Sequence, residues 1–223
     1  MEKYKENFIK FLVECNALKF GEFELKSGRI APYFINSGMF NDGEKIKKLG
    51  EYYAETIKAN FKDDFDGLYG PAYKGIPLCV AAAIGLKNLG INKGYVFNRK
   101  EAKDYALRDN LIGMQADANT SLILVDDVIT SGKAIRESLD VLKNCGNPKV
   151  KGIIVSVDRQ EKGNADKNAL KQVEEELGIK VFSIVKLKEI IQILHNKKVD
   201  GKIYIDDAIF KKIEDYTKEY GAE

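Results

Sequence analysis

Residues 122–138, LILVDDVITSGKAIRES, join an acidic pair to a turn rich in hydroxyl groups. Asp126 and Asp127 follow four apolar residues, and two neighbouring carboxylates repel each other unless hydroxyl groups or a cation lie between them. The loop behind them has the opposite preference, because its hydroxyls and backbone N–H groups suit an anion. A helix starting after this loop adds free N–H groups and the positive end of its dipole. A sugar phosphate, with hydroxyls on one side and phosphate on the other, fits both halves.

Residues 122–138 are also compatible with two different roles. An apolar run followed by Asp occurs in the magnesium-binding strand of P-loop ATPases, but the sequence contains no GxxxxGK[ST] string, and in TSGKA the Lys is followed by Ala. An acidic helix N-cap that binds no ligand remains open, although one cap does not require two acids and a Thr-Ser-Gly turn.

The order of the surrounding elements places the acidic pair at the edge of a sheet. Short β-rich runs alternate with helical patterns from about residue 65. We predict strands at 67–70, 94–97, 121–125, 151–157 and 180–185, and helices at 75–89, 134–145, 165–177, 187–197 and 206–221. This alternation predicts an α/β fold with a mostly parallel central sheet flanked by helices. In such sheets ligands bind beyond the carboxyl ends of the strands, where the acidic pair falls.

The first 40 residues lie outside this alternation. Helical spacing of apolar residues predicts a helix over 3–18, and FELKSGRIAPYFINSG (23–38) predicts a β-hairpin-like subdomain. A further helical pattern runs through residues 46–57. We therefore expect a single domain over 1–223, to which residues of about 1–40 contribute a small N-terminal subdomain.

Composition narrows the function classes. A net charge of +2 with 31% charged residues argues against a strongly basic nucleic-acid binder. No apolar run approaches ~18 residues, and the N-terminus lacks the apolar core of a signal peptide, so we expect neither membrane insertion nor secretion. The three cysteines, far apart in sequence, form no CxxC pair and suggest reduced thiols in a cytoplasmic protein.

Seven basic residues lie in predicted loops rather than on predicted helix faces. They fall in segments marked by Gly, Pro or Asn and are Lys26, Arg29, Lys74, Arg99, Lys100, Lys103 and Arg159. A solvated surface remains open for KEAKD (100–104), and a structural salt bridge remains open for Arg159. His195, the only histidine, lies far from these segments, so we do not expect proton transfer by imidazole.

The stretch VDDVITSGKA resembles the phosphoribosyl pyrophosphate (PRPP) motif of type I phosphoribosyltransferases. Four further segments, FGEFELKSGRIAPYFIN (20–36), GPAYKGIP (70–77), FNRKEAKD (97–104) and SVDRQEKG (156–163), are similar, in matching order, to those of orotate phosphoribosyltransferases. This resemblance implies the type I phosphoribosyltransferase fold, with the N-terminal subdomain as a hood over the base site. It implies transfer of the 5-phosphoribosyl group from PRPP to orotate, giving orotidine 5′-monophosphate and pyrophosphate in UMP biosynthesis.

The resemblance also assigns roles to individual residues. Expected contacts to PRPP are Lys26, Tyr73, Lys74, Arg99, Lys100, Lys103, Tyr105, Asp126, Asp127, Val128, Ile129, Thr130, Ser131, Gly132, Lys133 and Ala134. Expected contacts to orotate are Lys26, Phe34, Ile35, Thr130 and Arg159. The residues expected to be catalytic are Lys103, Asp126 and Asp127. An arginine suits the orotate carboxylate physically, because its planar fork can bind a carboxylate through two hydrogen bonds.

The resemblance further implies Mg²⁺ carried by PRPP and pyrophosphate rather than by protein ligands. It implies a homodimer with shared active sites, in which Lys103 reaches the neighbouring site. Two positions depart from the family pattern: Tyr105 stands where histidine is common, and Ile35 replaces a second aromatic residue.

Two rival functions share the same sugar-phosphate motif. A PRPP-sensing regulator of nucleic-acid binding could lose the cations for the leaving group and gain a basic face or a DNA-binding module. A purine salvage transferase would have little use for Arg159 or the LKSGR segment. The loop cations and the small net charge favour an enzyme acting on orotate.

Overall fold

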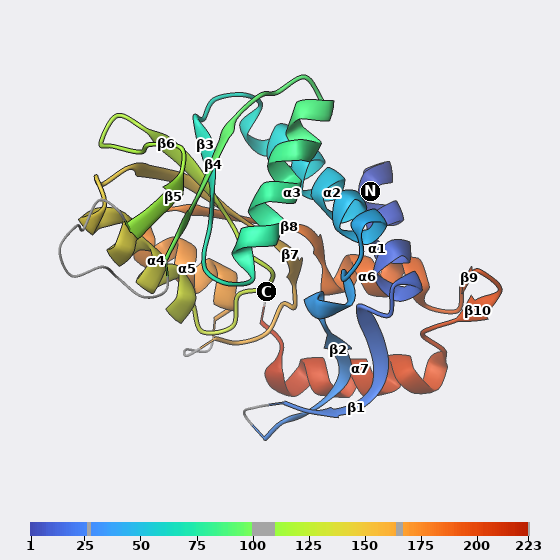
Figure 1. The fold of residues 1–223 in the computed structure, drawn as a ribbon. Helices are drawn as coiled ribbons and strands as arrows, with labels where there is room; N and C mark the ends of the chain where they lie inside the picture. Colours follow the sequence, from blue (N-terminus) through green and yellow to red (C-terminus); the bar gives the residue numbers. More distant parts are fainter. Residues whose placement is uncertain (26–27, 100–109, 164–166, 223) are drawn as a thin grey trace.

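A computed structural model describes residues 1–25, 28–99, 110–163 and 167–222 (Figure 1). The helices are α1 (Lys3–Glu14), the 3-10 helix η1 (Ser37–Met39), α2 (Gly43–Phe61), α3 (Gly75–Asn88), α4 (Lys133–Asn144), α5 (Ala169–Leu177), α6 (Leu187–Leu194) and α7 (Asp207–Tyr220). The strands are β1 (Leu18–Glu24), β2 (Ile30–Ile35), β3 (Gly67–Gly70), β4 (Gly94–Asn98), β5 (Leu111–Gly113), β6 (Ser121–Val125), β7 (Lys149–Asp158), β8 (Lys180–Lys186), β9 (Lys198–Val199) and β10 (Lys202–Ile203).

The central sheet has six strands in the order β5-β4-β3-β6-β7-β8. All neighbours pair in parallel except β4 and β5, which are antiparallel. The prediction of a mostly parallel α/β sheet is therefore confirmed. The short edge strand β5 and the β9–β10 hairpin were not predicted, because runs of two or three residues carry almost no periodic signal.

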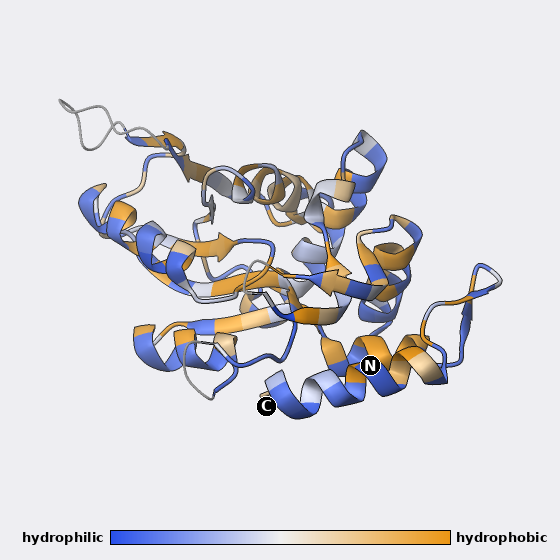
Figure 2. Cartoon of the chain, turned by 90° about the horizontal axis from the view of Figure 1, so that it is seen from below, coloured by the Kyte–Doolittle hydropathy of each residue, from blue (hydrophilic) through white to orange (hydrophobic). Residues whose placement is uncertain are grey.

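Helices cover both faces of this sheet (Figure 1). Alternation along each strand divides the apolar residues between the faces: Leu68 and Ile123 join the core formed with α1, α2 and α3, whereas Tyr69 and Leu122 join the core formed with α4 and α5. Figure 2 shows apolar strands in the interior and hydrophilic residues along the outer helices. Among the described helices none is long and apolar enough to cross a membrane.

The N-terminal subdomain is a small antiparallel sheet of β1 and β2. Its first strand begins at Leu18, earlier than the predicted start at residue 23, and the predicted helix over 3–18 ends already at Glu14. Asn16 turns the chain between them with a φ of +56°. Helix α7 packs along this hairpin, where the rings of Tyr33 and Tyr216 meet edge to face at 6.1 Å. The sequence did not predict this contact between the two ends of the chain.

Candidate active site

The acidic pair lies at the carboxyl end of β6 and is almost fully buried. Asp126 and Asp127 are 8% and 9% exposed. The Tyr53 hydroxyl of α2 donates to the Asp126 carbonyl at 2.8 Å, and the Ser156 hydroxyl of β7 donates to the Asp127 carbonyl at 2.7 Å. Because neighbouring elements hold the backbone of both aspartates, their carboxylates keep fixed positions at the sheet edge.

The Asp127 carboxylate contacts both a hydroxyl group and a cation, the two kinds of partner expected for an acidic pair. Ser37 Oγ and Lys74 Nζ each lie 2.8 Å from Asp127 Oδ2. Ser37 comes from η1 and Lys74 from the turn after β3, so the segment after the hairpin and the central sheet meet at this oxygen. Sequence reasoning found Lys74 but missed Ser37, which stands 90 positions from Asp127.

The pKa of the Asp126 carboxyl group is raised by its surroundings. Burial, followed by the negative charge of Asp127, raises the pKa of Asp126 from its ordinary value of 3.8 to about 6. The Asp127 backbone N–H donates to Asp126 Oδ1 at 2.9 Å and offsets part of this effect. Near neutral pH the Asp126 carboxylate is therefore a charge destabilised by burial and by its neighbour, which favours ligands that donate hydrogen bonds to it.

The loop between β6 and α4 has the geometry of an anion site. Gly132 is the N-cap of α4 with a φ of +72°, and having no side chain it cannot cap the first N–H groups of the helix itself. An added Cβ at Gly132 would lie 2.5 Å from Val173 Cγ2. A cavity of about 270 Å³ lies against this loop; its lining includes Asp126, Val128, Ile129, Thr130, Ser131, Gly132, Lys133 and Ala134.

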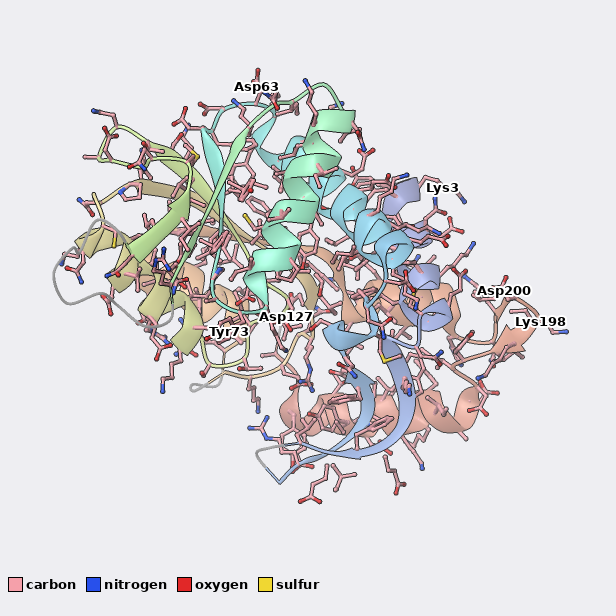
Figure 3. The ribbon with its side chains drawn as sticks, in the orientation of Figure 1. Lys3, Asp63, Tyr73, Asp127, Lys198 and Asp200 are labelled. Carbon is pink, nitrogen blue, oxygen red and sulfur yellow. The ribbon has the colours of Figure 1, made fainter. Side chains whose placement is uncertain are left out.

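The turn that carries Tyr73 and Lys74 is fixed from the end of β4. Asn98 Oδ1 accepts hydrogen bonds from the Ala72 backbone N–H at 3.0 Å and from the Tyr69 hydroxyl at 2.9 Å. Asn98 therefore supports this turn, a role that no local pattern in the sequence predicts. Tyr73 is 66% exposed, and Figure 3 shows Tyr73 and Asp127 on the same lower side of the sheet.

Arg159 follows β7 and forms a salt bridge, the alternative that the sequence had left open. Its Nη2 donates to Glu161 Oε1 at 2.7 Å, and its guanidinium lies 5.3 Å from the centre of the Tyr33 ring. The same arginine also lines a cavity of about 700 Å³. Other predicted site residues in the lining of this cavity are Phe34, Ile35, Lys74, Ile129, Thr130 and Ser131.

Comparisons with known proteins decide the family. Residues 36–188 match the family described as "Phosphoribosyl transferase domain". Orotate phosphoribosyltransferases from Clostridium botulinum and Clostridium acetobutylicum are each 47% identical to this chain over 100% of both proteins. The chain belongs to the orotate phosphoribosyltransferase family. A crystal structure of an orotate phosphoribosyltransferase from Francisella tularensis matches with 38% identity and a TM-score of 0.82, covering 97% of this chain and 100% of that one.

Membership of the orotate phosphoribosyltransferase family confirms the family and the fold that the five segments predicted. An adenine phosphoribosyltransferase from Thermoanaerobacter pseudethanolicus, 15% identical with a TM-score of 0.51, shares the fold alone. The orotate phosphoribosyltransferase match also spans the C-terminal residues beyond 188, including α7.

Some predicted site residues lie outside the described residues, namely Lys26, Lys100, Lys103 and Tyr105. Arg99 follows the end of β4, where its backbone N–H donates to the Asn110 carbonyl at 2.8 Å. The structure therefore brings together the acidic pair, the loop of residues 128–132 (the anion loop) and Lys74 with Phe34, Ile35 and Arg159, while the roles assigned to the individual residues stay predictions.

The carboxylates of the acidic pair are the donor atoms of this site that a divalent cation could use. Across the described ranges, no group of three His, Cys, Asp or Glu residues could hold a metal ion. Asp126 and Asp127 offer hard oxygen atoms, but Lys74 and Ser37 already bind one oxygen of Asp127. This donor set fits a magnesium ion only if most of its ligands come from the substrate and water, which Mg²⁺ readily accepts.

Proposed function

We propose that this chain transfers the 5-phosphoribosyl group from PRPP to orotate and releases orotidine 5′-monophosphate and pyrophosphate. One observation carries the assignment of the site: the 700 Å³ cavity is lined both by Thr130 and Ser131 of the anion loop and by Arg159. A phosphate-binding loop and a carboxylate-binding arginine in one cavity suit a reaction between a sugar phosphate and a base that bears a carboxylate.

The acidic pair holds the ribose in this proposal. Carboxylates are hydrogen-bond acceptors, so Asp126 and Asp127 bind the ribose hydroxyls while residues 128–134 hold the 5′-phosphate. Ser37 and Lys74 fix the Asp127 carboxylate before substrate arrives. The reacting carbon of the sugar is thereby placed between the anion loop and the base.

Cations stabilise the leaving group. Breaking the bond between C1 and pyrophosphate develops positive charge on the ribose and negative charge on the pyrophosphate. Lys74 and Arg99, together with Lys26, Lys100 and Lys103, supply positive charge around the pyrophosphate. Magnesium carried by PRPP would neutralise part of the same charge.

Orotate can be positioned through its carboxylate, and its N1 loses a proton to the departing pyrophosphate or to water as the bond from N1 to C1 forms. Arg159 binds its carboxylate, and Phe34 and Ile35 border its ring. No imidazole takes part: His195 stacks on Phe210 at 4.1 Å and its Nε2 lies 3.0 Å from Asp207 Oδ1, on the α7 side of the molecule.

The wider assembly is proposed on the resemblance. Residues of about 1–40 form a hood over the base, which the position of Phe34 and Ile35 in the cavity lining supports. Two copies form a homodimer with shared active sites, and Lys103 of each copy serves the neighbouring one. The protein acts in the cytoplasm.

The test is a direct assay of the purified protein with orotate, PRPP and Mg²⁺. We expect the ultraviolet absorption band of orotate to decrease, and pyrophosphate to appear in equal amount. Hypoxanthine and uracil, offered separately, should not be consumed at a comparable rate. Consumption of either in place of orotate would overturn the substrate assignment.

A further inference from the structure

Arg159 is held in a partly buried ion pair that lies beside the proposed base site. Its side chain is 17% exposed and that of Glu161 is 14% exposed, with 2.7 Å between Arg159 Nη2 and Glu161 Oε1. A buried guanidinium without an anion nearby would be strongly unfavourable. Glu161 therefore compensates the charge of Arg159 in the absence of substrate.

Tyr33 fixes Glu161 in turn. This tyrosine is completely buried in β2, one residue before Phe34, and its hydroxyl donates to Glu161 Oε1 at 2.6 Å. Burial and the charge of Glu161 raise the pKa of the Tyr33 hydroxyl well above its ordinary value, so it stays a donor. The Tyr33 ring also lies under the guanidinium of Arg159. Glu161 and Tyr33 together determine where the guanidinium points.

This arrangement leaves Arg159 able to bind a second anion. A guanidinium has five N–H donors, and the bond to Glu161 uses one nitrogen. Arg159 Nε is buried and has no hydrogen-bond partner within the part of the chain that the structure describes. Because Arg159 also lines the 700 Å³ cavity, donors remain for a carboxylate bound there.

The segment that carries the ion pair is anchored by the end of α7. The Lys162 backbone N–H donates to the Tyr220 carbonyl at 2.9 Å, and the Ala222 N–H donates to the Gln160 carbonyl at 2.8 Å. The backbone of residues 160–162 is thus held by two hydrogen bonds to the C-terminal residues. A segment held in this way can keep Glu161, and with it Arg159, in a fixed position.

From these contacts we infer that Glu161 is a positioning residue, which, held by the Tyr33 hydroxyl, aims Arg159 at the carboxylate of orotate. The inference rests on the proposed function. If it holds, the affinity for orotate depends on Tyr33 and Glu161, which are not among the expected substrate contacts, whereas the affinity for PRPP does not.

The test compares steady-state kinetics of Tyr33→Phe and Glu161→Gln with wild type. We expect KM for orotate to rise about tenfold or more in each variant, since each change removes a hydrogen bond to a charged group, while KM for PRPP stays within about twofold. Tyr52→Phe is the control: it removes a tyrosine hydroxyl from another part of the core, where the Tyr52 ring packs against Phe8 and Phe11, so its kinetics should equal those of wild type.

The outcomes separate the positioning role from the proposed function. A wild-type protein that leaves orotate unchanged removes the proposed function itself. With an active wild type, an unchanged KM for orotate in Tyr33→Phe overturns the positioning role, and so does an equal rise of both KM values, which indicates a general structural role. A lower KM for orotate would also overturn it, because Glu161 would then compete with the substrate. Should Glu161→Gln fail to fold, Tyr33→Phe, which keeps the ion pair, decides alone.

Discussion

Lys74 Nζ lies 2.8 Å from Asp127 Oδ2, although the two residues follow different strands of the sheet, β3 and β6. The ion pair is asymmetric, because the lysine side chain is 71% exposed and the aspartate side chain only 12%. An exposed lysine gains little from such a pair, about 0–1 kcal/mol. Lys74 can therefore move to a phosphate group of a ligand, while Ser37 still holds the same carboxylate oxygen of Asp127.

The first prediction concerns Asp127 and its hydroxyl partner. Asp127→Asn should lower kcat/KM for PRPP by several tenfold steps, each about 1.4 kcal/mol, because the neutral amide binds the ribose hydroxyls more weakly in the transition state. Ser37→Ala should lower kcat/KM less, since Asp127 keeps its charge. Steady-state kinetics with both substrates provide the measurement, and circular dichroism controls for folding. Near wild-type turnover of Asp127→Asn would remove the sugar-binding role.

The second prediction uses the acidity of Asp126. Its folded-state pKa of about 6 lies above the ordinary 3.8, so the folded protein binds this proton more tightly than the unfolded chain. Relative to the ionised form, protonated Asp126 stabilises the fold. This contribution to the free energy of unfolding is fully present below about pH 4 and is lost as the pH rises through about 6. Asp126→Asn, which has no charge to bury, should therefore raise the free energy of unfolding by roughly 1–3 kcal/mol at neutral pH.

The same variant should gain little stability near pH 4, and it should lose activity at about pH 7.5. Urea unfolding at about pH 4 and about pH 7.5, with kinetics at the second, measures both effects. A gain in stability that is equal at the two pH values would show that the charge of Asp126 is not its cause.

The third prediction concerns the anion loop. Gly132→Ala places a Cβ 2.5 Å from Val173 Cγ2 in a residue with a φ of +72°, so it should destabilise the fold by roughly 1–3 kcal/mol. It should also raise KM for PRPP more than KM for orotate. Gly178→Ala is the control, because Gly178 has a φ of +67° but no atom within 4 Å of the added Cβ. Equal effects of both variants on KM for PRPP would argue against a phosphate site at Gly132.

The sequence predicted the elements that bear strong patterns. Alternating strands and helices predicted the parallel sheet, and the acidic pair after LILV predicted the edge where the cavity lies. What it could not predict depends on contacts between distant segments. Neither the bond from Ser37 to Asp127 nor the support of Ala72 by Asn98 leaves a trace in local spacing, because each partner lies in a different element.

The base site shows the same limit. The sequence predicts Arg159 as a carboxylate ligand or, alternatively, as half of a salt bridge, and the structure contains the salt bridge beside the cavity. Which groups hold this pair was not predictable, because Tyr33 reaches Glu161 across 128 positions. The early start of β1 was missed for a local reason: a bulge between Phe20 and Phe23 breaks the two-residue alternation.

The fourth prediction is that Arg159→Lys chiefly weakens orotate. A lysine keeps the positive charge but loses the planar fork, so KM for orotate should rise about tenfold or more while KM for PRPP changes little. Steady-state kinetics with each substrate varied in turn provide the measurement. Equal weakening of both substrates, or of neither, would place Arg159 away from the base.

The last prediction concerns Lys103, which belongs to the charged stretch KEAKDYALRDNL (100–111) and lies outside the described residues. Our proposal of a homodimer with shared sites places Lys103 in the site of the neighbouring copy. Two inactive variants, Lys103→Ala and Asp127→Asn, should then restore activity when their subunits exchange.

The recovery follows from counting intact groups in a hybrid dimer. If Lys103 acts on the neighbouring site, one site of the hybrid combines an intact Asp127 with an intact lysine from the partner subunit, and about half of the wild-type activity per dimer is expected. If Lys103 acts within its own subunit, every site lacks one group and activity stays at the level of the separate variants. An affinity tag on one variant shows that hybrids form. A hybrid that forms and remains inactive rules out the shared site.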